Sequence, residues 1–462
     1  MDIAEAPSRP LNMFRKPKPA LAHAIYDRLD RIQEVVEQHE AERRKRDRAS
    51  AERFRDCLRG LCIDLFDAYL TDPHLLVGVR RDNNAFRRDN PALPAYATAR
   101  TFRAALDGLE KAGYVEEVSL GNEASGKSTR VRGTIKLAQQ LNIGHLKRDS
   151  LIDTSDVIIL RVGPKDRKRR LGFAETPDTQ RWRHNLNLIN KHFSKYTIAL
   201  EIDHDLQRHM EHVRLQAARS KARAEGSHFR YQKVDTRSTR LHRVFNSADW
   251  TEGGRFYGAW WQSIPKQFRQ HILINGKHTC EHDYSAIHLR ILYQLAGKPM
   301  PRVGDPHAEP YGEEHRNAVK RAFNVMLNAR NWPRPETVPE FDEAKLGMSW
   351  KQFLGGIREH HRPIKNHLMS GIGTKLQRLD ADIAEAVMLK FMEMDYPCLP
   401  IHDSFITYQT LTDELPGIMQ QVAKECGNVV IPAKLVYAAQ YNGPIGPVDA
   451  DITDILKSIT RE

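Results

Sequence analysis

The sequence predicts an α+β protein with more than one domain, on three observations. The chain has 462 residues, which is enough for two or three separate cores. Within residues 73–148, a helical pattern is followed by two β-prone segments around a polar turn. In the C-terminal half, helical patterns alternate with short apolar segments, and two of these segments end in an aspartate.

The composition argues for a globular protein and against a membrane protein. Hydrophobic residues make up 40% of the chain and charged residues 28%, which does not match a disordered sequence. No apolar run approaches the roughly 18 residues of a membrane span, and residues 1–20 lack the apolar core of a signal peptide. The five cysteines are scattered without a CxxC pair, which excludes an ordinary zinc module and argues against a disulfide framework. We therefore expect a cytoplasmic location and no membrane partner.

The charge is strongly basic, at +12, and it is clustered. Residues 161–170 hold six basic residues and one acidic residue, and residues 214–243 hold nine and two. Phosphate backbones attract such clusters, so the charge favours a polyanion partner. The alternative is a soluble enzyme that is merely basic, with these clusters as solvated helix faces.

Residues 73–148 resemble a winged helix-turn-helix domain. Apolar residues from Phe102 to Leu109 recur at helical spacing, Gly113 ends that helix, and the phrase LEKAGYVE is typical of the family. The resemblance implies DNA contacts from basic residues on the helix and on the wing, namely Arg100, Arg103, Lys111, Lys127, Arg130 and Arg132. The alternative is a winged helix that contacts only proteins.

Residues 121–129, GNEASGKST, satisfy the phosphate-binding pattern GxxxxGK[ST]. A true P-loop leads into a helix whose N-terminus faces the phosphates. Here the next residues, TRVRGTIKL, are β-like, so we interpret the pattern as the tip of the wing.

Two aspartates stand where apolar segments end. Asp283 follows KHTCEH and precedes the amphipathic IHLRIL, and Asp403 lies at the tip of an expected hairpin, PCLPIHDSFITY. Carboxylates at the ends of adjacent strands can share two Mg²⁺ ions, which stabilise the attacking and leaving oxygens in phosphoryl transfer. Composition alone does not show that these two residues meet.

A basic helix is predicted over residues 315–329. Arg316, Lys320, Asn324 and Asn328 recur every four residues on one face. Two cations one turn apart can hold a triphosphate. The alternative is a solvated helix face.

In order and spacing, five segments between residues 253 and 442 resemble the motifs of family A DNA polymerases and the related single-subunit RNA polymerases. DYSAIHLRIL is similar to motif A, RNAVKRAFN to motif B and IHDSF to motif C. GGRFYGAWWQSIP and LQRLDADIAEAVM resemble two further segments that contact the primer and template.

The resemblance implies a role for each matching residue. Asp283 and Asp403 become catalytic metal ligands for two Mg²⁺ ions, or Mn²⁺ in their place, with the Tyr284 carbonyl as a further ligand. Arg316 and Lys320 would hold the incoming triphosphate. His402 would lie near the primer 3′ end, and Arg255 and Gln377 would contact the primer-template.

Several residues depart from the family pattern. Asn324 and Asn328 stand where the family has aromatic residues that stack on the incoming base. His288 replaces the glutamate that blocks a ribose 2′-hydroxyl, and the HDS of motif C matches the RNA polymerase branch. The preference between dNTP and NTP therefore stays open. The short stretch between Lys320 and Asp403 implies reduced fingers, and no upstream DxE pattern indicates a proofreading exonuclease.

The expected architecture is a right-hand polymerase, with an antiparallel palm sheet and helical fingers and thumb, preceded by the winged helix. Its parts are a disordered basic tail (1–25), a charged helical segment (26–72), the winged-helix-like domain (73–148), a basic, mostly helical thumb-like region (149–250), and the palm with reduced fingers (251–462). The expected activity is DNA synthesis on a primed DNA or RNA template. The alternatives are an RNA polymerase or primase, and a DNA-binding replication or regulatory protein with an inert polymerase fold.

Overall fold

The computed structural model describes residues 6–39, 46–87, 90–120, 128–141, 150–164, 168–225, 229, 231–301 and 305–438. The chain packs as two compact units. Unit 1 contains residues 1–177 and 203–238, and unit 2 contains residues 178–202 and 239–462. Within the described ranges, no helix has the length and apolar character needed to cross a membrane.

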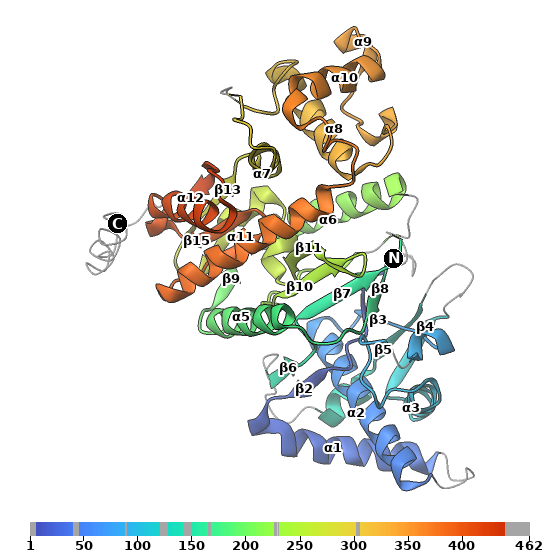
Figure 1. The fold of residues 1–462 in the computed structure, drawn as a ribbon. Helices are drawn as coiled ribbons and strands as arrows, with labels where there is room; N and C mark the ends of the chain where they lie inside the picture. The colour runs from blue at the N-terminus through green and yellow to red at the C-terminus, as the bar shows by residue number, and fades with distance from the viewer. Residues whose placement is uncertain are drawn as a thin grey trace. The chain divides into compact units, whose positions relative to one another are not determined.

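Unit 1 combines helices with short strands (Figure 1). Its elements are β1 (Ser8–Pro10), β2 (Arg15–Pro17), α1 (Pro19–Gln38), α2 (Arg48–Thr71), β3 (Leu76–Val79), α3 (Ala99–Lys111), β4 (Val115–Ser119), β5 (Thr129–Gly133), α4 (Ile135–Leu141), β6 (Leu151–Asp153), β7 (Ile158–Val162), β8 (Arg169–Leu171) and α6 (His204–Glu225). One sheet has the order β1-β3-β5-β4, in which β5 is antiparallel to both neighbours and β1 is parallel to β3.

The N-terminal segment is ordered, so the expected disordered tail is wrong for residues 6–25. These residues form β1, β2 and the start of α1. The guanidinium of Arg9 is buried against α2, where it contacts the carboxylates of Asp64 at 2.8 Å and Asp67 at 3.2 Å. A buried arginine is stable only when it is paired, and these contacts fix the tail to the helix.

The boundary expected between residues 72 and 73 does not separate two cores. Phe54 and Leu58 of α2, Phe102 and Leu106 of α3, and Val131 of β5 belong to one hydrophobic cluster. The helix and hairpin of the winged-helix prediction, α3 and β4–β5, are present in the expected order.

The ends of α3 and of the hairpin follow from local geometry. Gly113 ends α3 with φ of +76°, and the Tyr114 amide donates to the Leu109 carbonyl at 2.9 Å, as in a Schellman motif. The GxxxxGK[ST] pattern is followed by the strand β5 and not by a helix, as we expected. Its residues 121–127 lie outside the described ranges.

Unit 2 contains a four-stranded antiparallel sheet with the order β14-β15-β13-β16 (Figure 1). Its elements are α5 (Pro177–Phe193), β9 (Ile198–Leu200), β10 (His242–Asn246), β11 (Asp249–Tyr257), β12 (Ile272–Ile274), β13 (Thr279–Tyr284), α7 (Ile287–Leu295), α8 (Arg316–Asn328), α9 (Glu343–Leu346), α10 (Trp350–His360), α11 (Gly373–Glu393), β14 (Leu399–Ile401), β15 (Ser404–Tyr408), α12 (Glu414–Gly427) and β16 (Ala433–Ala438).

The prediction of a mostly helical thumb over residues 149–250 is wrong in two respects. It contains strands from β6 to β10 beside α5 and α6, and it is divided between the two units. Basic residues are so frequent in this region that the short apolar segments of its strands were not recognised in the sequence.

Ion pairs attach α11 to the β10–β11 hairpin. The fully buried guanidinium of Arg243 on β10 donates to the Gly254 carbonyl at 2.6 Å and pairs with Asp382 at 2.7 Å and with Glu385. Because removing one partner of a buried pair leaves an uncompensated charge, these contacts hold α11 in place.

Two adjacent glycines in α10 provide a matched test of packing. Gly355 has open space around it, whereas a Cβ on Gly356 would overlap the hydroxyl of Tyr311, whose ring stacks on Phe353 with centroids 5.0 Å apart. We expect Gly355→Ala to raise the free energy of unfolding by about 1 kcal/mol through helix propensity. Gly356→Ala should lower it by about 1–3 kcal/mol through overpacking. Urea denaturation measures both, and equal effects would contradict the packing around Tyr311.

Candidate active site

The pairing of β13 with β15 brings Asp283 and Asp403 to the same end of the sheet. Asp283 is the register partner of Ser404, and the Tyr284 amide donates to the Asp403 carbonyl at 3.1 Å. Asp283 therefore lies on β13, and Asp403 lies in the turn that leads into β15, one residue out of register with Asp283. This is the juxtaposition that the sequence alone could not establish.

Two residues with positive φ shape the backbone around these aspartates. His402 has φ of +61° in the two-residue turn between β14 and β15, so that Asp403 lies at the hairpin tip as expected. Ala286 has φ of +51° and is the N-cap residue of α7, which begins shortly after Asp283. The Nδ1 atom of His402 is buried and has no hydrogen-bond partner within the described part of the chain. Strained residues of this kind are concentrated at functional sites.

The two carboxylates interact electrostatically. Burial, followed by the charge of Asp403, raises the pKa of Asp283 to about 7, and the charges of Lys320 and Lys266 act in the opposite direction. Asp283 thus faces a second carboxylate in a partly desolvated position, with two lysines close enough to influence it. Such an arrangement attracts a cation.

An ion cluster lies beside the carboxylate pair. Arg255 on β11 binds the buried carboxylate of Asp380 on α11 through Nε, at 3.1 and 3.2 Å, and through its terminal nitrogen. His288 on α7 contacts the same carboxylate at 2.7 Å and the Arg255 guanidinium at 3.3 Å. The charges of Arg255 and Asp403 both influence the pKa of His402, which burial lowers. The cluster fixes the side chains of Arg255 and His288.

The basic face of α8 is confirmed. Lys320, Asn324 and Asn328 are exposed, and the opposite face buries residues such as Val319 and Phe323. Asn328 turns back on its own helix, where its amide donates to the Asn324 carbonyl at 2.8 Å. Because Lys320 is on the exposed face, its ammonium group lies away from the core.

The Arg316 side chain already has a protein partner. Its guanidinium pairs with Asp305 at 2.7 Å, and a bound anion would have to replace that carboxylate.

Two buried histidines support the inner face of α8. The ring of Phe323 lies 5.9 Å from that of His307 and 5.4 Å from that of His361. Burial is the main cause that lowers the pKa of His307 to about 4 and of His361 to about 3, from an ordinary 6.5. The Nδ1 atom of His361 lies 3.1 Å from the Tyr293 hydroxyl.

This arrangement predicts a loss of stability in acid. The folded state keeps both rings neutral while the unfolded chain protonates them, so their stabilisation is complete above pH 6.5 and is lost as the pH falls from 6.5 toward 4 and 3. We expect the free energy of unfolding to fall between pH 7 and pH 5. His361→Gln should reduce that slope, by up to about 1.4 kcal/mol per pH unit near pH 5. The exposed His23→Gln is the control, and an equal slope in both variants would contradict the prediction.

The donor set around Asp283 fits a hard divalent cation. The carboxylates of Asp283 and Asp403 are hard oxygen donors of the kind that such a cation takes. The Tyr284 side chain is buried, and its hydroxyl donates to the Met419 carbonyl at 2.5 Å. Across the described residues, no group of three or more His, Cys, Asp or Glu side chains could hold a metal. Few protein ligands are usual for Mg²⁺, which keeps water and substrate phosphates in its shell.

Sequence reasoning missed three residues of this site. Asp380 lies in LQRLDADIAEAVM, in which the resemblance gives a role only to Gln377, half-buried one turn earlier on α11. Lys266 acts on Asp283, and Glu281 binds Arg269 at 2.7 Å and the Ser404 hydroxyl at 2.5 Å. An acidic residue at an apolar helix position was the available signal for Asp380.

The expected DNA-binding residues of unit 1 differ in their surroundings. Arg100 and Lys111 on α3 are exposed. Arg103 donates to Asn83 at 3.0 Å, and Arg132 binds Glu116 at 2.8 and 3.1 Å. Arg130 is half-buried on β5, and Lys127 lies outside the described ranges. Arg100 and Lys111 are thus the most accessible cations of this set.

No family model and no curated protein matches this chain. Among solved structures, the POL domain of Pol1 from M. smegmatis, in complex with DNA primer-template and dNTP, is similar with a TM-score of 0.31 and 13% sequence identity. The similarity covers 81% of this chain and 82% of that chain. Because a score this low does not define a shared fold, the functional argument depends on the residues of the site.

Proposed function

We propose that this protein is a template-directed nucleotidyltransferase, a family A-like DNA polymerase without proofreading that uses two-metal phosphoryl transfer. The observation that carries the proposal is that Asp283 on β13 lies beside the turn that holds Asp403, whose charge contributes to raising the pKa of the partly buried Asp283. The resemblance of five ordered segments to polymerase motifs supports the same activity.

In this proposal, Asp283, Asp403 and the Tyr284 carbonyl hold two Mg²⁺ ions, for which Mn²⁺ can substitute. Bound there, the ions stabilise charge on the attacking and leaving oxygens. Lys320 neutralises the triphosphate as charge moves toward the pyrophosphate, and Arg316 joins it after releasing Asp305. The primer 3′-hydroxyl oxygen attacks the α-phosphorus, and pyrophosphate leaves.

The surrounding residues would position the primer, template and incoming nucleotide. Arg255, oriented by Asp380, and His402 lie beside the carboxylate pair, where a primer terminus would bind, and Gln377 extends that surface along α11. His288, which Asp380 orients, would contact the sugar of the nucleotide. Asn324 and Asn328 would line the base site in place of aromatic residues. The winged-helix-like part of unit 1, with Arg100, Arg103 and Arg130, would bind duplex DNA.

Primer extension tests the proposal directly. The full chain is incubated with a labelled primer on a DNA or RNA template, Mg²⁺, and either dNTPs or NTPs, beside an Asp403→Ala variant. We expect extension by the wild type only, with the nucleotide that complements the template. The nucleotide set that is used separates a DNA polymerase from an RNA polymerase or primase. Tight DNA binding without extension in any set would contradict the proposal and favour a DNA-binding protein.

A further inference from the structure

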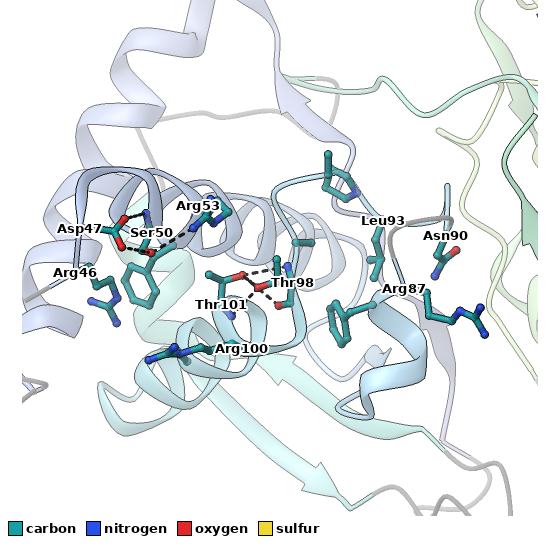
Figure 2. A pocket seen from close by; sticks show the side chains of 16 residues that line it. Arg46, Asp47, Ser50, Arg53, Arg87, Asn90, Leu93, Thr98, Arg100 and Thr101 are labelled. Carbon is teal, nitrogen blue, oxygen red and sulfur yellow. Dashed lines mark hydrogen bonds between the residues drawn. The ribbon is translucent and has the colours of Figure 1, made fainter. Parts of the chain in front are cut away.

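A pocket lies in unit 1, whereas the carboxylate pair belongs to unit 2 (Figure 2). Its volume is about 950 Å³, at the upper end of the range for sites that bind small molecules. The walls come from the start of α2, the segment that follows Phe86, and the first turns of α3. The proposed phosphoryl transfer does not use this pocket, although Arg100 in its wall is also one of the residues proposed to bind duplex DNA.

The pocket has a strong excess of positive charge. Its lining includes four arginines, Arg46, Arg53, Arg87 and Arg100. Asp47 is the single acidic residue among the described residues that line it, and its carboxylate already accepts from the amide and hydroxyl of Ser50 at 2.8 and 3.0 Å. Guanidinium groups in the wall supply several N–H donors, which suit an anionic ligand with several acceptor oxygens.

The arginines differ in how they are held. Arg100 forms no ion pair or side-chain hydrogen bond with any residue in the described ranges, so its guanidinium can bind a ligand without giving up a protein partner. Arg53 donates to the Ser50 hydroxyl at 3.2 Å, and Arg46 lies over the ring of Phe54 at 3.6 Å from its centroid. The site therefore combines two oriented guanidinium groups with one that is unengaged.

The remaining lining is apolar or hydroxyl-bearing. Phe86 is half-buried, with its ring packed against Phe102 at 4.9 Å, and Leu93 lies in the same wall. Thr98 and Thr101 form a reciprocal cap at the start of α3. The Thr98 hydroxyl accepts from the Thr101 amide, whereas the amides before Thr101 have no acceptor inside the helix and add partial positive charge on the same side. A ligand that fits has a phosphate at one end and a flat or apolar body at the other.

We propose that this pocket binds a nucleotide that carries a terminal phosphate, either the 5′-phosphorylated end of a nucleic-acid strand or a free mononucleotide. The phosphate lies among Arg46, Arg53 and Arg100, and the base lies against Phe86 and Leu93. The choice of a nucleotide over other phosphate esters rests on the proposed function. The preference for a phosphate rests on the pocket alone.

Binding without catalysis tests this inference. Two single-stranded oligodeoxynucleotides of one sequence, labelled at the 3′ end, differ only in a 5′-phosphate or 5′-hydroxyl, and fluorescence anisotropy with the full chain in EDTA measures their affinities. We expect the 5′-phosphate to tighten binding about tenfold or more, and thymidine monophosphate but not thymidine to compete. If the monophosphate displaces the labelled strand at concentrations near its own dissociation constant, the ligand is a free nucleotide. If only the unlabelled 5′-phosphorylated strand competes, the ligand is the end of a strand.

Variants assign the effect to the pocket. Arg53→Gln with Arg100→Gln should abolish the preference for the 5′-phosphate. Arg31→Gln with Arg55→Gln removes the same charge from α1 and α2 outside the pocket, and this variant should keep the preference for the 5′-phosphate. The circular dichroism melting curve checks the fold of each variant, and Arg100→Gln alone replaces the double variant if that one is unstable. Equal affinity for both strands in the wild type, or a preference that survives the pocket variants, overturns the inference.

The outcome is separable from that of primer extension. Asp403→Ala removes extension and should keep the 5′-phosphate preference, because Asp403 belongs to unit 2. A preference without any extension by the wild type would retain the pocket and reject the polymerase. Extension by a wild type that shows no preference for the 5′-phosphate would retain the polymerase and reject the pocket.

Discussion

Replacing Asp283 by asparagine is expected to lower the rate of nucleotide incorporation by about a thousandfold or more, which is about 4 kcal/mol of transition-state stabilisation. The same substitution should make the folded protein more stable in the absence of metal. Asparagine has nearly the same shape as aspartate but no charge, so it removes the repulsion between two carboxylates in a partly buried position. Loss of activity with a gain in stability is typical of residues that are retained for function.

Rapid-quench incorporation and thermal unfolding in EDTA measure the two effects. Mg²⁺ at ten times its dissociation constant should stabilise the wild type by about 1.4 kcal/mol, and should stabilise Asp283→Asn much less. Glu393→Gln, which neutralises an exposed carboxylate at the end of α11, is the control and should leave activity and the Mg²⁺ effect unchanged. If Asp283→Asn retains full activity, or loses activity while becoming less stable than the control, the two-carboxylate mechanism is wrong.

Replacing Lys320 by glutamine should lower kcat/KM for the incoming nucleotide by about a hundredfold, or about 2.7 kcal/mol. Lys320 is exposed on the outer face of α8, and its charge already acts on Asp283, so it lies where a triphosphate beside the carboxylate pair would need a cation. We expect most of the loss in the KM for the nucleotide, with the affinity for primed template unchanged. Single-nucleotide incorporation at varied nucleotide concentration separates these quantities.

Arg321→Gln is the matched control for Lys320→Gln. Arg321 is the next residue on α8 and is also exposed, but it pairs with Glu340 at 3.1 Å and donates to the Thr337 carbonyl. Its loss should change kcat/KM by less than about threefold. Comparable losses in both variants would mean that the lysine contributes only to the general positive charge of the helix.

Local patterns in the sequence determined much of the C-terminal half. The apolar alternation around Asp403 predicted the β14–β15 hairpin, and the four-residue period of Arg316, Lys320, Asn324 and Asn328 predicted the exposed face of α8. These features depend on contacts between near neighbours, which hydrophobic periodicity encodes directly. The exposed position of Arg100 on α3 follows from the same kind of pattern.

Other features depended on residues that are far apart in the chain. The order of the N-terminal tail requires Asp64, some 55 residues beyond Arg9, and the ion cluster of Arg255 requires Asp380, 125 residues away. No local pattern announces such partners, because the charge that compensates a buried arginine can come from any element that packs against it. The pairing of Arg316 with Asp305 joins residues only 11 apart, but helical periodicity does not show which acidic side chain an arginine will meet. The short strands of residues 149–250 were missed because basic residues dominate that stretch.

The amino-acid sequence by itself determined the types of the principal helices and strands, and which side chains face away from them. Only the tertiary structure decided that Asp283 and Asp403 share one end of a sheet and that four arginines surround a pocket in unit 1. Periodicity reports how a segment divides its surface between core and solvent. Which surfaces then meet depends on the packing of the whole unit. This packing brings acidic and basic side chains from distant segments together into a site.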